Sequence, residues 1–132
     1  MDEPQNVERI KLLLVDDEQA YVRILSKRLT KRDFDVTIAF SGIQGIQALR
    51  KQDFDVAVLD LKMEDMDGIE VLKIFKKMSP NLAVIMLTGH GSEQAAREGV
   101  EFGAFDYLLK PCELEELVST IKAAAEKGRS GS

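Results

Sequence analysis

The sequence predicts an α/β fold in which helices pack on both faces of a five-stranded parallel sheet. Short apolar runs alternate along the chain with segments whose apolar residues recur every three or four positions, which is the pattern of successive βαβ units. The run at 55–60 is apolar almost throughout, as expected for a central strand covered on both faces. Four of the runs end on acidic, hydroxyl or basic residues, and in a parallel sheet such ends share one edge.

The apolar runs give the expected strands in chain order. They lie at 11–15, 34–39, 55–60, 82–87 and 104–109. The second is the richest in β-branched residues, which favour extended structure.

The amphipathic segments between these runs give the expected helices. They lie at 19–31, from 41 or 42 to 52, in a segment that ends before Ser79, at 92–102 and at 113–126. The third helix ends there because a residue before proline disfavours the helical backbone. The side chains expected to face the core follow helical spacing. They are Val22, Leu25 and Leu29; Ile43, Ile46 and Leu49; Val71, Ile74, Phe75 and Met78; and Leu114, Leu117, Val118 and Ile121.

The segment 92–102 is expected to form the weakest and most mobile helix. Its apolar residues are two alanines, Val100 and Phe102, and it contains Gly99. A glycine inside a helix costs about 0.5–1 kcal/mol relative to alanine. The two strands that flank this helix end in residues with candidate functional roles, so its mobility bears on function.

Length and composition predict one domain over 9–127, between a polar leader at 1–8 and a flexible tail at 128–132. The 45% hydrophobic and 31% charged residues are typical of soluble globular proteins. No apolar run approaches the roughly 20 residues that cross a bilayer, and no signal-peptide pattern precedes the first strand. The single cysteine, Cys112, fits a reducing cytoplasm. A net charge of −5 argues against direct binding of nucleic acid.

Polar residues follow four of the expected strands. Asp16 and Asp17 follow the first, Asp60 ends the third, Thr88 follows the fourth and Lys110 follows the fifth. Each acidic residue alone would be explained as a turn residue, but together they would gather at one sheet edge. Carboxylates hold a hard divalent cation such as Mg²⁺, and a carboxylate can attack a phosphoryl group to form an acyl phosphate. The sequence therefore predicts a phosphorylatable site.

These residues resemble the receiver domain of two-component response regulators over 10–125. The loop 60–68, DLKMEDMDG, matches the family, and the segments MLTGHG and GAFDYLLKP look closest to receivers of the nitrogen-regulator type. The resemblance implies a flavodoxin-like, doubly wound five-stranded parallel sheet in the order 2-1-3-4-5, with five helices. One departure is Glu64, where many members have proline; it adds negative charge near the mouth of the site and is expected to loosen the loop.

The resemblance also implies the chemistry of the site. Asp60 would be the nucleophile that becomes 4-aspartylphosphate, with Thr88 and Lys110 binding the phosphoryl oxygens, and the Lys110–Pro111 bond would be cis. The ligands of Mg²⁺, for which Mn²⁺ can substitute, would be Asp16, Asp17, Asp60 and the backbone carbonyl of Lys62. Asp16 would act largely through water.

Signalling is expected to depend on a switch pair, Thr88 and Tyr107, although an aromatic residue packed on a strand explains Tyr107 equally well. Lys62 and His90 stand at positions that tune acyl-phosphate lifetime in the family. The implied partner is a sensor histidine kinase or a phosphotransfer protein. Phosphorylation would change the surface of the fourth helix, fifth strand and fifth helix, with homodimerisation as one consequence.

Three alternatives remain open. A phosphohydrolase of the haloacid dehalogenase type would place its nucleophile after the first strand, in an Asp-x-Asp arrangement that differs from Asp16-Asp17-Glu18. A flavodoxin-like cofactor carrier would need a phosphate-binding loop there, and these acids would repel FMN. A pseudo-receiver would bind partners without phosphorylation, which the set of Asp60, Thr88 and Lys110 disfavours.

Overall fold

Five strands and five helices alternate along the chain, and the computed structural model describes residues 9–89 and 92–130. The strands are β1 Lys11–Val15, β2 Asp35–Ala39, β3 Val56–Asp60, β4 Ala83–Thr88 and β5 Asp106–Leu109. The helices are α1 Gln19–Lys31, α2 Gly42–Lys51, α3 Gly68–Met78, α4 Glu93–Glu101 and α5 Leu114–Ser130. The leader expected at 1–8, and residues 131–132 of the expected tail, lie outside the described residues.

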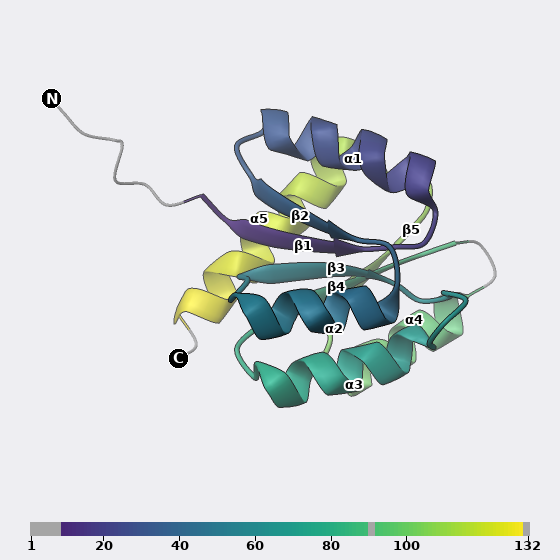
Figure 1. The fold of residues 1–132 in the computed structure, drawn as a ribbon. Coiled ribbons are helices and arrows are strands. Elements are labelled where there is room, and N and C mark those ends of the chain that lie inside the picture. Colours follow the sequence, from purple (N-terminus) through teal and green to yellow (C-terminus); the bar gives the residue numbers. More distant parts are fainter. Residues whose placement is uncertain (1–8, 90–91, 131–132) are drawn as a thin grey trace, which may run out of the picture.

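All five strands are parallel, and their order is β2-β1-β3-β4-β5, which confirms the predicted sheet (Figure 1). The register sets Val15 beside Leu59, and Asp60 beside Leu87 in the neighbouring strand. Every residue of β3 and β4 is buried. The residues that follow β1, β3 and β4 therefore meet at one edge of the sheet.

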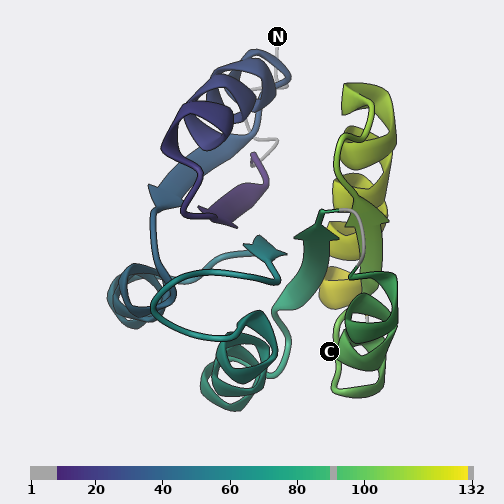
Figure 2. The ribbon, with the colours of Figure 1, turned by 90° about the vertical axis from the view of Figure 1, so that its right-hand side faces the viewer.

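Helices cover both faces of the sheet (Figures 1 and 2). Successive side chains of a strand point to opposite faces. Leu12 and Leu14 accordingly pack with the apolar faces of α1 and α5, whereas Leu13 and Val15 pack with α2 and α3. Helix α4 lies over β4 and β5 on the second of these faces.

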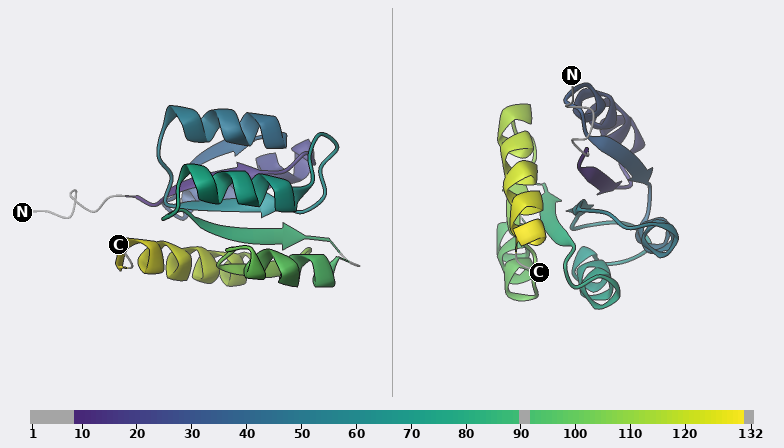
Figure 3. Two further views of the ribbon diagram at one scale, coloured as in Figure 1. Left: turned by 90° about the horizontal axis from the view of Figure 1, so that it is seen from below. Right: turned by 90° about the vertical axis from the view of Figure 1, so that its left-hand side faces the viewer.

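Strand β1 begins and α5 ends on the side of the molecule opposite the carboxyl ends of the strands (Figure 3). The loops at the carboxyl ends are therefore remote from the point where the chain leaves α5. Among the described helices, none is both long and apolar enough to cross a bilayer.

Helix α2 buries most of the predicted face but not its first residue, since Leu49 is buried and Ile46 packs against the core as predicted. Ile43 was expected to face the core but is 53% exposed, and the buried residues are Gly42, Gly45 and Leu49. A Cβ atom on Gly45 would lie 3.1 Å from Phe75 Cζ, so the glycine lets α2 approach α3 closely. A pattern of large apolar side chains cannot reveal a buried face made of glycine.

Two other predictions differ from the structure near the C-terminal ends of helices. Met78 was expected to be buried but is 38% exposed, because the buried stripe of α3 ends one turn earlier at Phe75. Helix α5 was expected to end near 126 but continues to Ser130, so 128–130 are helical and not part of a tail. Gly128 packs closely: a Cβ atom there would lie 3.2 Å from the carbonyl oxygen of Asn81.

Candidate functional site

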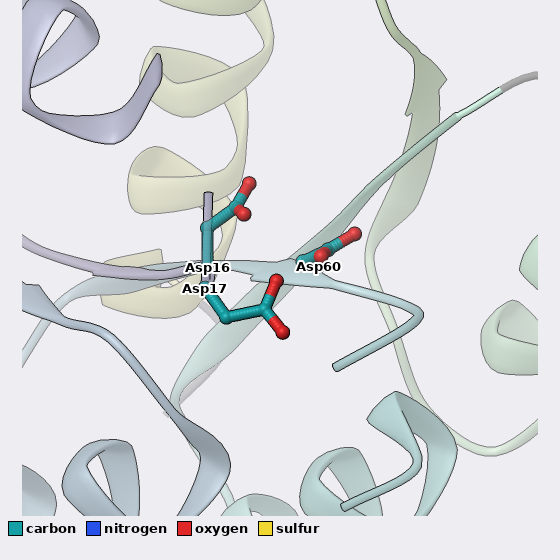
Figure 4. Close-up of side chains that lie close together, drawn as sticks. All are labelled: Asp16, Asp17 and Asp60. Carbon is teal, nitrogen blue, oxygen red and sulfur yellow. The ribbon is translucent and has the colours of Figure 1, made fainter. Parts of the chain in front are cut away.

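Three carboxylates meet at the carboxyl edge of the sheet. Asp16 and Asp17 leave the end of β1 beside Asp60 at the end of β3 (Figure 4). One carboxylate oxygen from each residue lies within 4.8 Å of the others. Oxygen ligands of Mg²⁺ lie about 2.0–2.1 Å from the ion, so opposite ligands are about 4 Å apart. The spacing and the all-oxygen donor set therefore fit a small hard cation.

The loop that follows β3 is tied to this cluster. The backbone N–H of Glu64 donates a 3.0 Å hydrogen bond to Asp17 Oδ2. Proline at this position could not make that bond, because it lacks the N–H group. Glu64 was expected to loosen the loop, yet its backbone N–H anchors the loop to Asp17.

Gly68 closes the same loop where α3 begins. Its N–H donates to the carbonyl oxygen of Leu61 at 2.8 Å. A Cβ atom on Gly68 would lie 2.6 Å from the carbonyl oxygen of Asp60 and 2.7 Å from Leu61 Cα. Only glycine therefore fits here without displacing the backbone that carries Asp60. Asp67, which precedes it, accepts the N–H of Ile69 and caps α3.

Asp65 joins the loop to a second helix. Its two carboxylate oxygens accept the N–H groups of Gly42 and Ile43, each at 3.0 Å, at the start of α2. Helix N-termini have unpaired N–H groups that favour a negative charge. Burial alone would raise the pKa of Asp65, but these hydrogen bonds outweigh it and hold the pKa below its ordinary value.

Asp60 is 6% exposed and surrounded by charge. Burial disfavours its charged form and repulsion from Asp16 adds to this effect, which together raise the pKa of Asp60 to about 6. The ammonium of Lys110 and the N–H of Lys62 act in the opposite direction. Asp60 is therefore a destabilised carboxylate, which positive charge placed in the site would relieve.

Lys110 reaches into the cluster from the residue after β5. Its Nζ donates to Asp16 Oδ2 at 2.8 Å and to Glu18 Oε1 at 2.6 Å, and lies 3.7 Å from Asp60 Oδ1. Nζ also lies 4.8 Å from the centroid of the Tyr21 ring. Burial lowers the pKa of Lys110, but the two hydrogen bonds outweigh burial and hold the pKa above its ordinary value. The ammonium therefore stays charged.

Sequence reasoning missed two of these contacts, those of Lys110 with Glu18 and with Tyr21. The available signal for Glu18 was its place directly after Asp16-Asp17, although nothing in the sequence assigned it a partner. The Lys110–Pro111 bond is cis, as the resemblance implied.

Thr88 and Tyr107 occupy neighbouring strands beside α4. Thr88 is 1% exposed, and its carbonyl oxygen accepts the N–H of Lys110 at 2.7 Å. Tyr107 is half-buried, and its hydroxyl accepts a 3.2 Å hydrogen bond from Arg97 Nε on α4. The ring of Tyr107 is thus linked to the helix whose mobility was predicted. Lys62 is exposed beside the site, whereas His90 lies outside the described residues.

Comparison with known proteins identifies a family. The model of the response regulator receiver domain matches residues 12–122. The transcriptional regulatory protein ZraR of Escherichia coli K12 is 36% identical over 117 residues, covering 89% of this chain and 26% of the relative. GlrR of the same strain is 36% identical over 116 residues, with 88% and 26% covered. The chain thus spans about a quarter of the length of the curated relatives it matches.

Solved structures agree on the fold. A response regulator receiver domain protein from Clostridium thermocellum has a TM-score of 0.89 and 31% identity, covering 93% of this chain and 99% of that one. NtrX from Brucella abortus, solved with ADP, has a TM-score of 0.89 and 25% identity, covering 94% of this chain and 29% of that one. These relatives match the nitrogen-regulator type that the sequence motifs indicate.

Proposed function

The chain belongs to the response regulator receiver domain family of two-component systems, and from this premise we propose that Asp60 accepts a phosphoryl group. One observation carries the proposal. A buried carboxylate with a raised pKa stands beside two further carboxylates, and the ammonium of Lys110 lies 3.7 Å away. Strongly shifted carboxylates beside a specific charged partner are typical of functional sites.

A divalent cation is part of the proposal. Asp16, Asp17 and Asp60 would hold Mg²⁺, or Mn²⁺ in its place, with the backbone carbonyl of Lys62 as a further ligand. When bound, the cation supplies positive charge that offsets repulsion among the carboxylates and polarises a phosphoryl oxygen. The close grouping of carboxylate oxygens and the anchor from Glu64 N–H to Asp17 support this assignment.

Receiver domains of response regulators interact with histidine kinases or phosphotransfer proteins, so the donor is a phosphohistidine. A carboxylate oxygen of Asp60 attacks phosphorus, and the new O–P bond forms as the donor's P–N bond breaks, with the electron pair leaving on the imidazole nitrogen. Lys110 stabilises charge on the phosphoryl oxygens, and the Thr88 hydroxyl donates a hydrogen bond to one of them. Water later attacks phosphorus, which restores the carboxylate and releases phosphate.

The signal leaves the site through α4, β5 and α5. Thr88 would move toward the phosphoryl group, and Tyr107 would turn into the space that this movement opens. That rotation must break the hydrogen bond between Tyr107 and Arg97, which couples β5 to α4. The changed surface would control a partner or an output domain, directly or by homodimerisation. Such coupling needs an element with two arrangements, which the predicted weakness of α4 would supply.

The test uses beryllofluoride, a stable mimic of the phosphoryl group, with amide NMR. We expect shifts that require Mg²⁺ and spread from Asp60 through Thr88 to Tyr107 and α4. Asp60→Asn should abolish them. Shifts confined to the immediate surroundings of Asp60, or the same shifts in Asp60→Asn, would contradict the proposed switch, and a complete lack of binding would indicate a pseudo-receiver.

A further inference from the structure

The ammonium of Lys110 is held by two carboxylates, neither of which is the proposed phosphoryl acceptor. Its distances to Glu18 Oε1 and Asp16 Oδ2 are 2.6 and 2.8 Å, both hydrogen bonds. Asp60 Oδ1 is 3.7 Å away, which exceeds hydrogen-bonding distance. The lysine expected to serve Asp60 therefore donates elsewhere.

A phosphoryl group on Asp60 would have to recruit this ammonium. A lysine ammonium has three N–H donors, and Glu18 and Asp16 each take one. The Tyr21 ring, with its centroid 4.8 Å from Nζ, restricts the space on another side. The third N–H is left for a phosphoryl oxygen, so a phosphoryl group on Asp60 would share the ammonium with both carboxylates, whose negative charge weakens its attraction for the phosphoryl oxygens.

Glu18 is the partner that can give way. The side chain of Asp16 is 6% exposed, and that of Glu18 is 61% exposed at the start of α1. An exposed carboxylate regains water when its ion pair breaks, whereas a buried one does not. The contact between Glu18 and Lys110 is thus the one that can open and close.

We propose that Glu18 is a positioning residue that restrains Lys110 and so slows phosphorylation of Asp60. Its carboxylate competes with the incoming phosphoryl group for the ammonium. The inference rests on the proposed function of Asp60. Exposed ion pairs contribute little free energy, so removing this one should accelerate phosphorylation by only about two- to five-fold.

A general charge effect must be separated from this competition, because any lost negative charge near the site favours an anionic phosphodonor. Glu64 provides the matched control. It is exposed, and its backbone N–H binds Asp17, so Glu64→Gln removes the same charge near the same site and keeps that N–H. Within the described residues, the ion pairs of Lys110 involve Asp16, Glu18 and Asp60 only.

The experiment compares wild type, Glu18→Gln, Glu18→Asp and Glu64→Gln as full chains. The rate of adduct formation with acetyl phosphate and Mg²⁺ is followed by intact mass at low and raised ionic strength. We expect about a two- to five-fold gain in Glu18→Gln, and a smaller gain in Glu18→Asp, whose shorter side chain keeps the charge. The gain in Glu64→Gln should be smaller than that in Glu18→Gln and should vanish with added salt, which screens exposed charges.

A second measurement needs neither metal nor phosphodonor. The ammonium NMR signal of Lys110 should shift in both Glu18 variants and stay in place in Glu64→Gln. An unmoved signal, an unchanged or slower rate in Glu18→Gln, or an equal gain in Glu64→Gln would overturn the inference. Adducts that form at one common rate would refute this inference alone, whereas no adduct in any chain would refute the proposed function and the inference with it.

Discussion

Replacing Asp60 with asparagine should stabilise the metal-free protein at neutral pH. Burial and the neighbouring Asp16 raise the pKa of Asp60 from an ordinary 3.8 to about 6. At about 1.4 kcal/mol for each pH unit, holding the carboxylate charged in the folded state costs about 3 kcal/mol. Water at the sheet edge reduces this cost of burial and charge repulsion. We therefore expect Asp60→Asn to raise the free energy of unfolding by about 1–3 kcal/mol.

The sign of the pH dependence follows from the raised pKa. The folded state binds the Asp60 proton more tightly than the unfolded chain does. Below its ordinary pKa of 3.8 the group is protonated in both states and costs nothing, whereas above about 6 it is charged in both and the full cost is present. The gain in the free energy of unfolding from Asp60→Asn should therefore be small in acid. It should grow as pH rises from 3.8 to about 6 and stay constant above that range.

The assay is urea denaturation of wild type and Asp60→Asn in EDTA, at several values between about pH 4 and about pH 8. Asp53→Asn makes the same exchange at an exposed residue just before β3, at the opposite edge of the sheet, and controls for the lost charge. Added Mg²⁺ should narrow the difference, because it stabilises wild type by binding the carboxylates. A gain independent of pH, or no gain near neutrality, would refute the reasoning.

Three further predictions concern the surrounding residues. Gly68→Ala should lower the free energy of unfolding by about 1–3 kcal/mol through backbone overlap, whereas Gly89→Ala, where a Cβ atom meets open space, should stay within about 0.5 kcal/mol of wild type in urea. Tyr107→Phe removes the bond from Arg97 and should speed amide hydrogen exchange in α4; unchanged exchange would show that this bond does not restrain the helix. Lys110→Met should cost about 3 kcal/mol without metal by leaving buried carboxylates unpaired, and much less with Mg²⁺; equal losses in both conditions would argue against the metal site.

The placement of the main site residues could be predicted because parallel strands align their ends. Asp16, Asp60, Thr88 and Lys110 each stand at the end of an apolar run, and the sheet brings those ends to one edge. This reasoning needs only strand direction and register. It does not depend on side-chain conformations, which the sequence does not reveal.

The contacts that the sequence did not reveal depend on such conformations. Glu18 and Lys110 are 92 positions apart, and several acidic residues near the strand ends could have paired with the lysine. The pairing is decided by where α1 begins and by the direction of both side chains. Gly45 makes another contact that the sequence did not reveal. Its close packing against Phe75 turns Ile43 outward, and the spacing of hydrophobic residues does not indicate that orientation.

The central claim is that Asp60 is phosphorylated in a reaction that requires a divalent cation. The most direct test incubates the chain with acetyl phosphate, with Mg²⁺ or with EDTA, and locates any adduct by intact mass and peptide mapping. The account predicts a single phosphoryl group on Asp60 that forms with Mg²⁺, fails to form in EDTA and is absent from Asp60→Asn. An adduct that persists in Asp60→Asn, or that forms equally well without metal, would contradict it.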